Sequence, residues 1–91
     1  MFNNKNIIIT GGTGSFGKEF AIYLLKNYKP KKVVVFSRDE LKQFDFSNFI
    51  KNKGYDLKKI RFFIGDVRDR SRLSLAFQNM DFVVHAAALK Q

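Results

Sequence analysis

The segment NIIITGGTGSFG, residues 6–17, decides the fold. Three consecutive isoleucines, Ile7–Ile9, predict a short strand that is buried on both faces. Glycines 12, 14 and 17 follow in the pattern Gly-x-Gly-x-x-Gly, and a helical pattern begins at Ser15. A strand that turns through these glycines directly into a helix is a strong candidate for a phosphate-binding turn, because the surrounding elements are the ones such a turn requires.

The glycines of this turn have separate physical roles. An early glycine, Gly11 or Gly12, permits the tight turn out of the strand. Gly14 lets the backbone approach a pyrophosphate without a Cβ in the way, and Gly17 lets the helix pack closely on the sheet. Free N–H groups and the positive helix end then face the phosphates, and the Ser15 hydroxyl adds a donor. The alternative is a glycine-rich turn without a ligand, whereas the missing Gly-Lys-Ser/Thr sequence excludes a Walker-type loop.

Apolar runs and helical patterns alternate along the chain. The expected strands cover 6–10, 32–36, 59–65 and 82–86, and the expected helices cover 15–28, 39–51 and a segment capped by Asp69. Apolar strands joined by helices predict a parallel sheet covered on both faces. Right-handed crossovers then give an α/β fold, β-α-β-α-β-α-β, with the order 3-2-1-4 of a doubly wound Rossmann sheet. Residues 1–91 are expected to be the N-terminal portion of a truncated domain, since no helix follows the fourth strand.

The first two expected helices differ in their apolar patterns. The first has one face at helical spacing, made of Gly17, Phe20, Ala21, Leu24 and Leu25. The second has a broad and irregular stripe, made of Leu41, Phe44, Phe46, Phe49 and Ile50. The existence of the second helix is therefore predicted more firmly than the face that it buries.

Composition limits the classes of site. The chain has 91 residues, no cysteine and a net charge of +9. The lack of cysteine excludes disulfides, thiolate nucleophiles and Cys-ligated zinc in these residues, and it suits a cytoplasmic location. Neither a signal peptide nor a membrane-length apolar run is predicted. The positive charge fits a nucleic acid, a membrane or a solvated lysine-rich surface, and its dispersal along the chain favours the last. A phosphate-rich ligand is a third possibility, which the glycine turn and the residues after the second strand favour.

The end of the second strand indicates which dinucleotide is bound. NAD sites usually place an acid there to accept a hydrogen bond from the ribose 2′-hydroxyl, whereas this chain has Ser37 followed by Arg38. A hydroxyl beside a guanidinium suits a 2′-phosphate, which arginine binds bidentately. We expect Asp39 to turn away and cap the second helix, and Lys42 to add positive charge. These residues predict NADP, with a solvated surface arginine as the alternative for Arg38.

The ends of the third and fourth strands carry further candidates. The Asp66 carboxylate can accept from the adenine amine while Val67 packs on the ring, although a loop or capping aspartate fits equally well. His85 is a weak candidate for a base, because no acid lies near it in sequence. Lys90 follows on the loop that faces the expected substrate cleft, where a cation can meet a phosphate or a sugar. A surface lysine near the chain end is the alternative for Lys90.

No complete catalytic set is present in these residues. A reductase of this type needs a proton-transfer group near the nicotinamide. The pairs Tyr28–Lys32 and Tyr55–Lys59 match Tyr-x-x-x-Lys, but the first spans Pro30 and the second lies in a turn. Neither pair therefore lies on one helical face. We expect this chain alone to bind a cofactor without turning over a substrate.

Four segments together resemble the extended short-chain dehydrogenases/reductases of bacterial polysaccharide biosynthesis. The segments are residues 9–17, 36–43, 61–69 and 85–91. Within this family the pattern is most similar to that of the inverting UDP-N-acetylglucosamine 4,6-dehydratases of pseudaminic acid synthesis. The resemblance implies that hydride passes from sugar C4 to bound NADP, water leaves across C5–C6, and hydride returns to C6 with inversion at C5. It also implies a homo-oligomer, with acid/base residues beyond Gln91.

The glycine pattern and the resemblance together give the candidate contacts. The residues expected around the cofactor are Gly11, Thr13, Gly14, Ser15, Phe16, Gly17, Ser37, Arg38, Asp39, Glu40, Leu41, Lys42, Asp66, Val67 and Ala86. Within this set the resemblance implies that 13–16 contact the pyrophosphate, 37–42 the 2′-phosphate and ribose, and 66–67 the adenine. Lys90 is implied as a contact of the substrate, UDP-N-acetylglucosamine.

Several functions are open on the sequence alone. The leading hypothesis is the cofactor-binding fragment of a UDP-N-acetylglucosamine 4,6-dehydratase. A UDP-sugar 4-epimerase or a 5-epimerising dehydratase is closely related to it. A non-catalytic NADP-binding module is a second class, and a nucleic-acid-binding domain that uses the +9 charge is a third.

Overall fold

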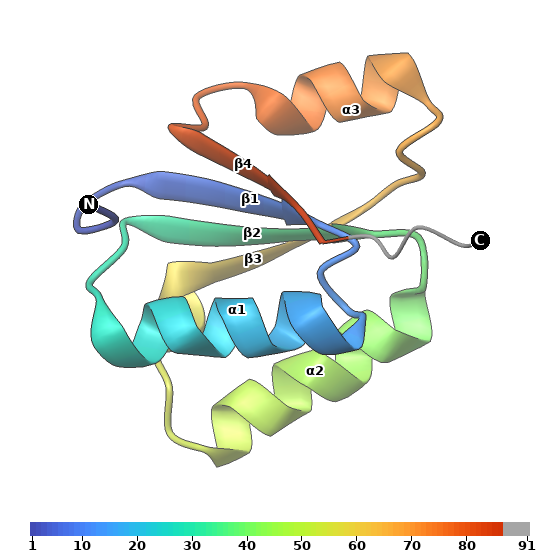
Figure 1. Cartoon of the computed structure of the whole chain (residues 1–91). Helices are drawn as coiled ribbons and strands as arrows, with labels where there is room; N and C mark the ends of the chain where they lie inside the picture. Colours follow the sequence, from blue (N-terminus) through green and yellow to red (C-terminus); the bar gives the residue numbers. More distant parts are fainter. Residues whose placement is uncertain (87–91) are drawn as a thin grey trace.

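In the computed structural model, which describes residues 1–86, one parallel sheet lies between helices (Figure 1). The strands are β1 (Asn6–Thr10), β2 (Lys32–Ser37), β3 (Ile60–Ile64) and β4 (Phe82–His85). The helices are α1 (Ser15–Asn27), α2 (Glu40–Asn52) and α3 (Arg70–Phe77), with a short 3₁₀ turn, η1 (Leu57–Lys59), before β3. The strand order β3-β2-β1-β4 confirms the predicted 3-2-1-4 arrangement.

The observed boundaries follow the local signals closely. The bounds of β1 are those predicted, and α1 ends at Asn27, before the buried Pro30. The turn η1 was not predicted; Asp56 caps it by accepting a hydrogen bond from the Lys58 N–H group. The longest helices of residues 1–86 have 13 residues, and none there is apolar and long enough to cross a membrane.

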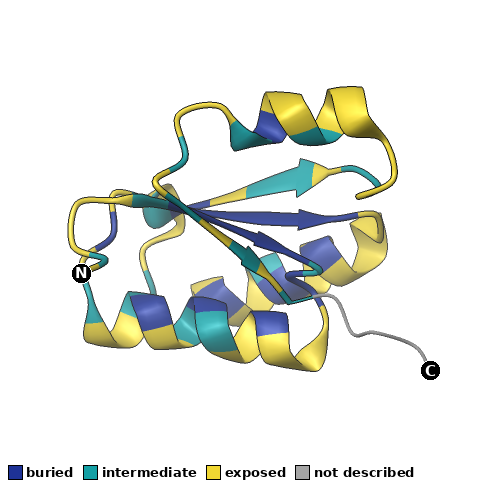
Figure 2. Ribbon diagram, turned by 45° about the horizontal axis from the view of Figure 1, so that its top comes forward, coloured by how far each residue is buried: buried dark blue, intermediate teal, exposed yellow. Residues whose placement is uncertain are grey.

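The core lies on both faces of the two central strands (Figure 2). Alternate residues point to opposite faces of a strand. On one face Ile7 and Ile9 pack in the cluster that includes Leu24 of α1 and Phe46 of α2. On the other face Ile8 belongs to the smaller cluster beneath α3. Helices therefore cover both faces, as the uniformly apolar strands predicted, with α1 and α2 on one side and α3 on the other (Figure 1).

The irregular stripe predicted for α2 was only partly correct. The buried residues of α2 are Gln43, Phe46 and Ile50, which share one helical face at spacings of three and four. Leu41 and Phe44 are exposed, and so is Phe49. Gln43 can be buried next to the ends of β2 and β3 because its side chain donates to backbone carbonyl oxygens there.

The strand register aligns the carboxyl ends of all four strands. Thr10 pairs with Phe36 on one side and with His85 on the other, and Ser37 pairs with Ile64. The loops that follow the strands therefore emerge at one edge of the sheet. Ligands of open α/β sheets bind in the crevice outside this edge.

Candidate dinucleotide-binding site

Gly11 makes the turn that leaves β1. Its φ of 67° lies in the left-handed region that favours glycine. Its N–H group donates to the Phe36 carbonyl oxygen at 2.9 Å, and the Gly12 N–H group donates to the same oxygen at 3.3 Å. The sequence left open whether Gly11 or Gly12 makes the turn; Gly11 is the one with the required backbone conformation.

Gly12 and Gly17 allow close packing. A Cβ on Gly17 would lie 2.6 Å from both the Gly11 carbonyl oxygen and the Gly12 Cα atom, so α1 packs directly on the turn. A Cβ on Gly12 would lie 2.6 Å from Cγ1 of Val35 in β2. The closest contact of a Gly17 Cβ is thus with the turn rather than with the sheet, while Gly12 provides the contact with the sheet.

Gly14 is the glycine of this pattern that the fold itself does not need. It is exposed, and an added Cβ would have only the Gly11 carbonyl oxygen near it, at 3.4 Å. Its φ of −76° and ψ of 173° are open to any residue. The space beside Gly14 therefore faces outward, where a ligand can approach the backbone.

The N-terminus of α1 lacks a side-chain cap. Gly14 stands at the N-cap, no acid lies in the first turn, and the N–H groups of Ser15, Phe16 and Gly17 have no acceptor within residues 1–86. By contrast, Asp39 caps α2 by accepting from the Lys42 N–H group at 3.0 Å, as predicted, and an aspartate also caps α3. Free N–H groups at the positive end of a helix fit a pyrophosphate.

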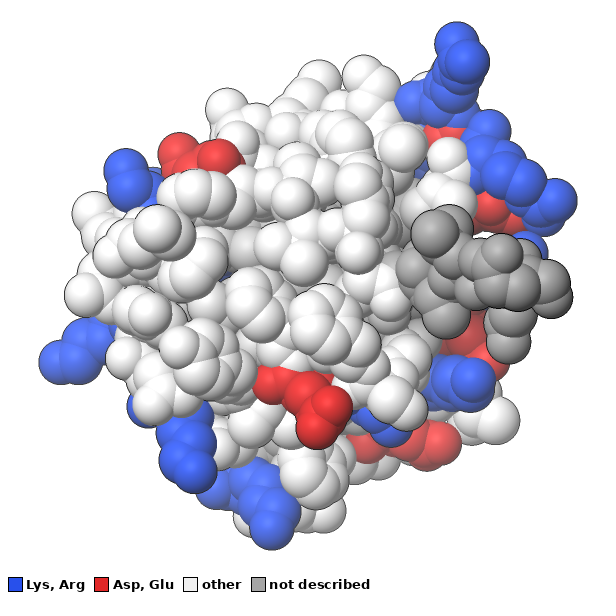
Figure 3. Space-filling model, in the orientation of Figure 1, with Lys and Arg blue, Asp and Glu red and all other residues white. Residues whose placement is uncertain are grey.

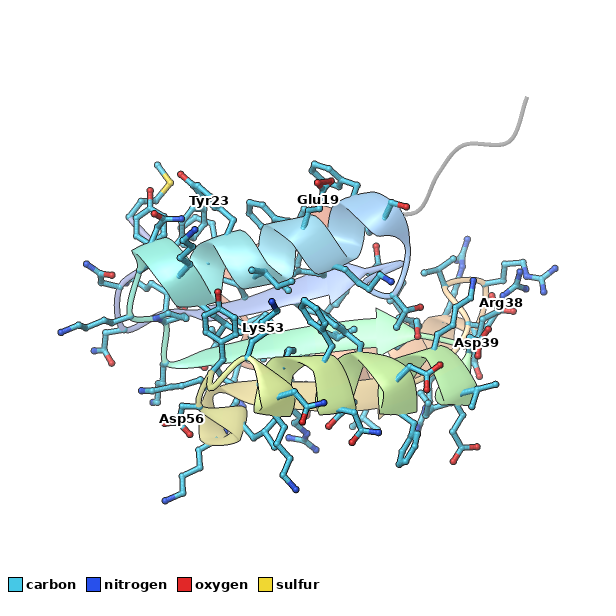
Figure 4. All side chains as sticks on the ribbon, turned by 90° about the horizontal axis from the view of Figure 1, so that it is seen from below. Glu19, Tyr23, Arg38, Asp39, Lys53 and Asp56 are labelled. Carbon is cyan, nitrogen blue, oxygen red and sulfur yellow. The ribbon has the colours of Figure 1, made fainter. Side chains whose placement is uncertain are left out.

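An arginine–aspartate–arginine cluster joins the ends of β2 and β3. Arg38 Nη1 lies 3.6 Å from Asp66 Oδ2, and Arg68 Nη2 lies 2.8 Å from the same oxygen. The Arg68 side-chain hydrogen bonds, and after them its backbone N–H group, hold the pKa of the Asp66 carboxyl well below its usual range. Arg38 itself projects beyond the end of the sheet (Figure 4), with 73% of its side chain exposed.

Gln43 is a site residue that sequence reasoning missed. It is 4% exposed, and its Nε2 group donates to the Ser37 hydroxyl at 2.9 Å and to the carbonyl oxygens of Ser37 and Phe63 at 3.2 Å each. Gln43 thereby joins the ends of β2 and β3. Ser37 is buried, and its hydroxyl oxygen accepts from this amide. The spacing of Gln43 to Phe46 and Ile50 was the available signal, because it places a polar side chain on the core face.

A Gln43→Leu substitution is expected to lower the free energy of unfolding by about 1–2 kcal/mol, because it leaves buried acceptors without their donor. Urea denaturation of the intact protein followed by circular dichroism measures this. Asn48→Leu, at an exposed position of the same helix, is the matched control and is expected to change stability by less than about 0.5 kcal/mol. Equal effects of the two substitutions would contradict the bracing role of Gln43.

A groove between α1 and α2 is lined by both Ser15 and Lys42. Its volume is about 580 Å³, and Lys18 also lines it. The sequence placed Ser15 at the phosphate turn and Lys42 after Arg38, so two separately predicted segments share this surface. Lys18 was not predicted; it is a further cation beside the N-terminus of α1.

Other predicted residues lie at the ends of β1 and β4, on the loop after β3 and on the first turns of α1 and α2. The Ala86 N–H group donates to the Thr10 carbonyl oxygen at 2.8 Å, beside the turn. His85 Nδ1 lies 2.7 Å from the Thr10 hydroxyl, so its ring links β4 to β1. Phe16 and Val67 are exposed, as are Glu40 and Leu41 on the first turn of α2. Lys90 lies outside the described residues.

Positive charge does not gather into one patch on the face seen in Figure 3. Lys and Arg side chains lie around its periphery, and its centre carries neither. Among the residues that the structure describes, no group of three or more His, Asp or Glu side chains is placed to hold a metal ion.

Comparison with known proteins agrees with this geometry. A family model described as polysaccharide biosynthesis protein matches residues 7–91. The chain belongs to this polysaccharide biosynthesis family. It is 58% identical, over 99% of its length, to the inverting UDP-N-acetylglucosamine 4,6-dehydratase of Campylobacter jejuni subsp. jejuni serotype O:23/36 (strain 81-176), of which it covers 25%. The resemblance drawn from the four sequence segments is confirmed.

The chain is also similar to proteins with other names. The UDP-glucose 4-epimerase of Rickettsia bellii (strain OSU 85-389) is 46% identical over the whole chain, which covers 26% of that protein. The X-ray structure of Pen from Bacillus thuringiensis superimposes with a TM-score of 0.88 and 42% identity, over 99% of this chain and 27% of Pen. The chain thus spans about a quarter of the length of the curated relatives that it matches.

Proposed function

We propose that residues 1–91 are the NADP-binding N-terminal part of a UDP-N-acetylglucosamine 4,6-dehydratase that inverts C5. The observation that carries this proposal is the uncapped N-terminus of α1, whose free N–H groups lie at the same edge of the sheet as Arg38. The 58% identity to the Campylobacter jejuni enzyme supports the substrate and the reaction. We further propose a cytoplasmic homo-oligomer that supplies sugars for surface or flagellin glycans.

The end of β2 supports NADP rather than NAD. Asp39, the first acid that follows β2 in the sequence, caps α2 by accepting from the Lys42 N–H group. The Arg38 guanidinium is exposed and has a 3.6 Å contact with Asp66, so it can still bind a 2′-phosphate bidentately, and Lys42 lies one helical turn away. An NAD-specific site would need an available carboxylate at this position.

Each part of the chain has a proposed task at this site. The N–H groups at Ser15–Gly17 bind the pyrophosphate, and Gly14 gives it room. Val67 packs on the adenine with the Asp66 carboxylate beside it, the small Ala86 leaves space for the cofactor, and Lys90 contacts the sugar nucleotide. When bound, NADP supplies a nicotinamide that accepts and returns hydride. The residues that move protons are proposed to lie outside residues 1–91.

A UDP-sugar 4-epimerase is the second candidate, favoured by the Rickettsia bellii relative. Incubation of the intact protein with UDP-N-acetylglucosamine and NADP distinguishes the two, with mass spectrometry and NMR of the product. A dehydratase gives a 4-keto-6-deoxy sugar that has lost one water and is inverted at C5. An isomer of unchanged mass, inverted only at C4, would establish the epimerase, and retention at C5 would exclude the inverting reaction.

Gly14→Ala is expected to weaken dinucleotide binding at least about tenfold, equivalent to the loss of one charged hydrogen bond of about 1.5 kcal/mol. The Cβ would occupy the space in which the pyrophosphate meets the backbone, while the fold tolerates it. NADP titration calorimetry on the intact protein measures the affinity. Unchanged affinity in a normally folded variant would show that the ligand does not approach Gly14.

A further inference from the structure

We propose that Arg68 sets the preference for NADP over NAD by neutralising Asp66 beside the Arg38 guanidinium. This proposal rests on the proposed NADP site. Arg68 acts through Asp66 and Arg38, so it is a positioning residue rather than a direct phosphate ligand.

Arg68 occupies both carboxylate oxygens of Asp66. Its Nε atom lies 3.1 Å from Oδ1 and 3.2 Å from Oδ2, and its Nη2 atom lies 2.8 Å from Oδ2. Arg38 reaches the same carboxylate only at 3.6 Å. Of the two arginines, Arg68 therefore satisfies the carboxylate, and Arg38 is left free to bind another anion.

The Asp66 charge needs this partner because it stands beside the proposed 2′-phosphate position. The carboxylate stays ionised far below neutral pH, since Arg68 lowers its pKa. An unpaired carboxylate there would draw the Arg38 guanidinium towards itself and repel a phosphate. NAD carries no 2′-phosphate, so its affinity does not depend on whether the Asp66 charge is neutralised.

Replacement of the Arg68 side chain is expected to leave the conformation of the loop after β3 unchanged. It is 79% exposed, and the 2.9 Å bond from the Arg68 backbone N–H group to Asp66 Oδ1 does not need that side chain. Arg72 does not replace it, because Arg72 Nε bonds the Ile64 carbonyl oxygen and its guanidinium lies over the Phe63 ring. Arg70 is exposed and has no ion pair within residues 1–86. It offers a matched control for the loss of one positive charge.

The test measures dissociation constants for NADP and NAD with the intact protein, by calorimetry, in the wild type, Arg68→Ala, Arg70→Ala and Arg68→Ala/Asp66→Asn. We expect Arg68→Ala to weaken NADP about fivefold, the upper end of what exposed charge pairs contribute, and NAD less than about twofold. Arg70→Ala is expected to change the NADP-to-NAD affinity ratio less than about twofold. Adding Asp66→Asn to Arg68→Ala is expected to restore the ratio, whatever it does to adenine binding.

The possible results of this test distinguish a failure of the role proposed for Arg68 from a failure of the proposed NADP site. A wild-type protein that binds both dinucleotides equally overturns both. A wild-type protein that prefers NADP, with a ratio that Arg68→Ala leaves unchanged or that Asp66→Asn does not restore, overturns the role of Arg68 alone. A merely structural role of Arg68 would weaken both dinucleotides together and would not be rescued by removal of the Asp66 charge.

Discussion

Replacing Gly17 by alanine is expected to lower the free energy of unfolding by about 3 kcal/mol, at the upper end of the usual cost of overpacking. The new Cβ would meet the Gly11 carbonyl oxygen and the Gly12 Cα atom at 2.6 Å each. Both are backbone atoms of the turn, so relief requires α1 to move away from β1. Urea denaturation of the intact protein, followed by circular dichroism, measures the change.

Gly14→Ala is the matched control, because it makes the same chemical change three residues earlier. Its backbone conformation is open to alanine, but alanine is a poorer N-cap than glycine, so the free energy of unfolding is expected to fall by about 1 kcal/mol or less, well below the loss for Gly17→Ala. Gly17→Ala thus tests the packing of α1 on the turn, and Gly14→Ala tests whether a dinucleotide binds against the turn. Equal losses of stability in the two variants would contradict the different roles assigned to these glycines.

Arg38→Ala is expected to weaken NADP binding by roughly 1.5–3 kcal/mol, the range for a hydrogen bond to a charged group, and to change NAD binding little. The guanidinium is the exposed cation at the end of β2, where the ribose 2′-position is proposed to lie. Calorimetric titration of the intact protein with both dinucleotides measures the two affinities. The charge-matched control is Lys53→Ala, at the opposite end of α2 (Figure 4), which is expected to alter neither. Equal losses for both dinucleotides would show that Arg38 does not recognise the 2′-phosphate.

The strands were predictable because they depend on local sequence patterns, and their order was predictable because crossovers between parallel strands are right-handed. Ile7–Ile9 and the glycines after them determine β1 and its turn, and right-handed crossovers then allow few sheet orders. The caps at Asp39 and Asp69 were predictable for the same reason, since a capping side chain bonds a backbone group three residues away.

The buried face of α2 was not predictable from its apolar residues. Leu41, Phe44 and Phe49 are as apolar as Phe46, yet they are exposed. The buried face is the one on which Phe46 and Ile50 pack in the core and Gln43 bonds the ends of β2 and β3. That choice depends on where backbone acceptors lie in three dimensions. A count of apolar residues carries no information about them.

The sequence allowed the location of the site at the strand ends to be predicted, but not the contacts between its side chains. Topology alone places the residues after β2 and β3 at one edge of the sheet. The pairing of Arg68 with both Asp66 oxygens, and the longer contact from Arg38, depend on the path of the loop after β3. For this reason the adenine contact and the loop aspartate were equally good interpretations of Asp66 from the sequence, and in the structure it is a loop carboxylate held by arginines within the candidate site.

The most direct measurement is the response of the backbone amides at the start of α1 to NADP, followed by NMR of the isotope-labelled intact protein. Binding through a cradle of free N–H groups predicts that the amide signals of Ser15, Phe16 and Gly17 shift saturably as NADP is added. The amide of Arg72, already bonded to the Asp69 cap of α3, is expected to stay in place. A folded protein that binds no dinucleotide, or one that saturates with NADP while these three signals do not move, would contradict the account.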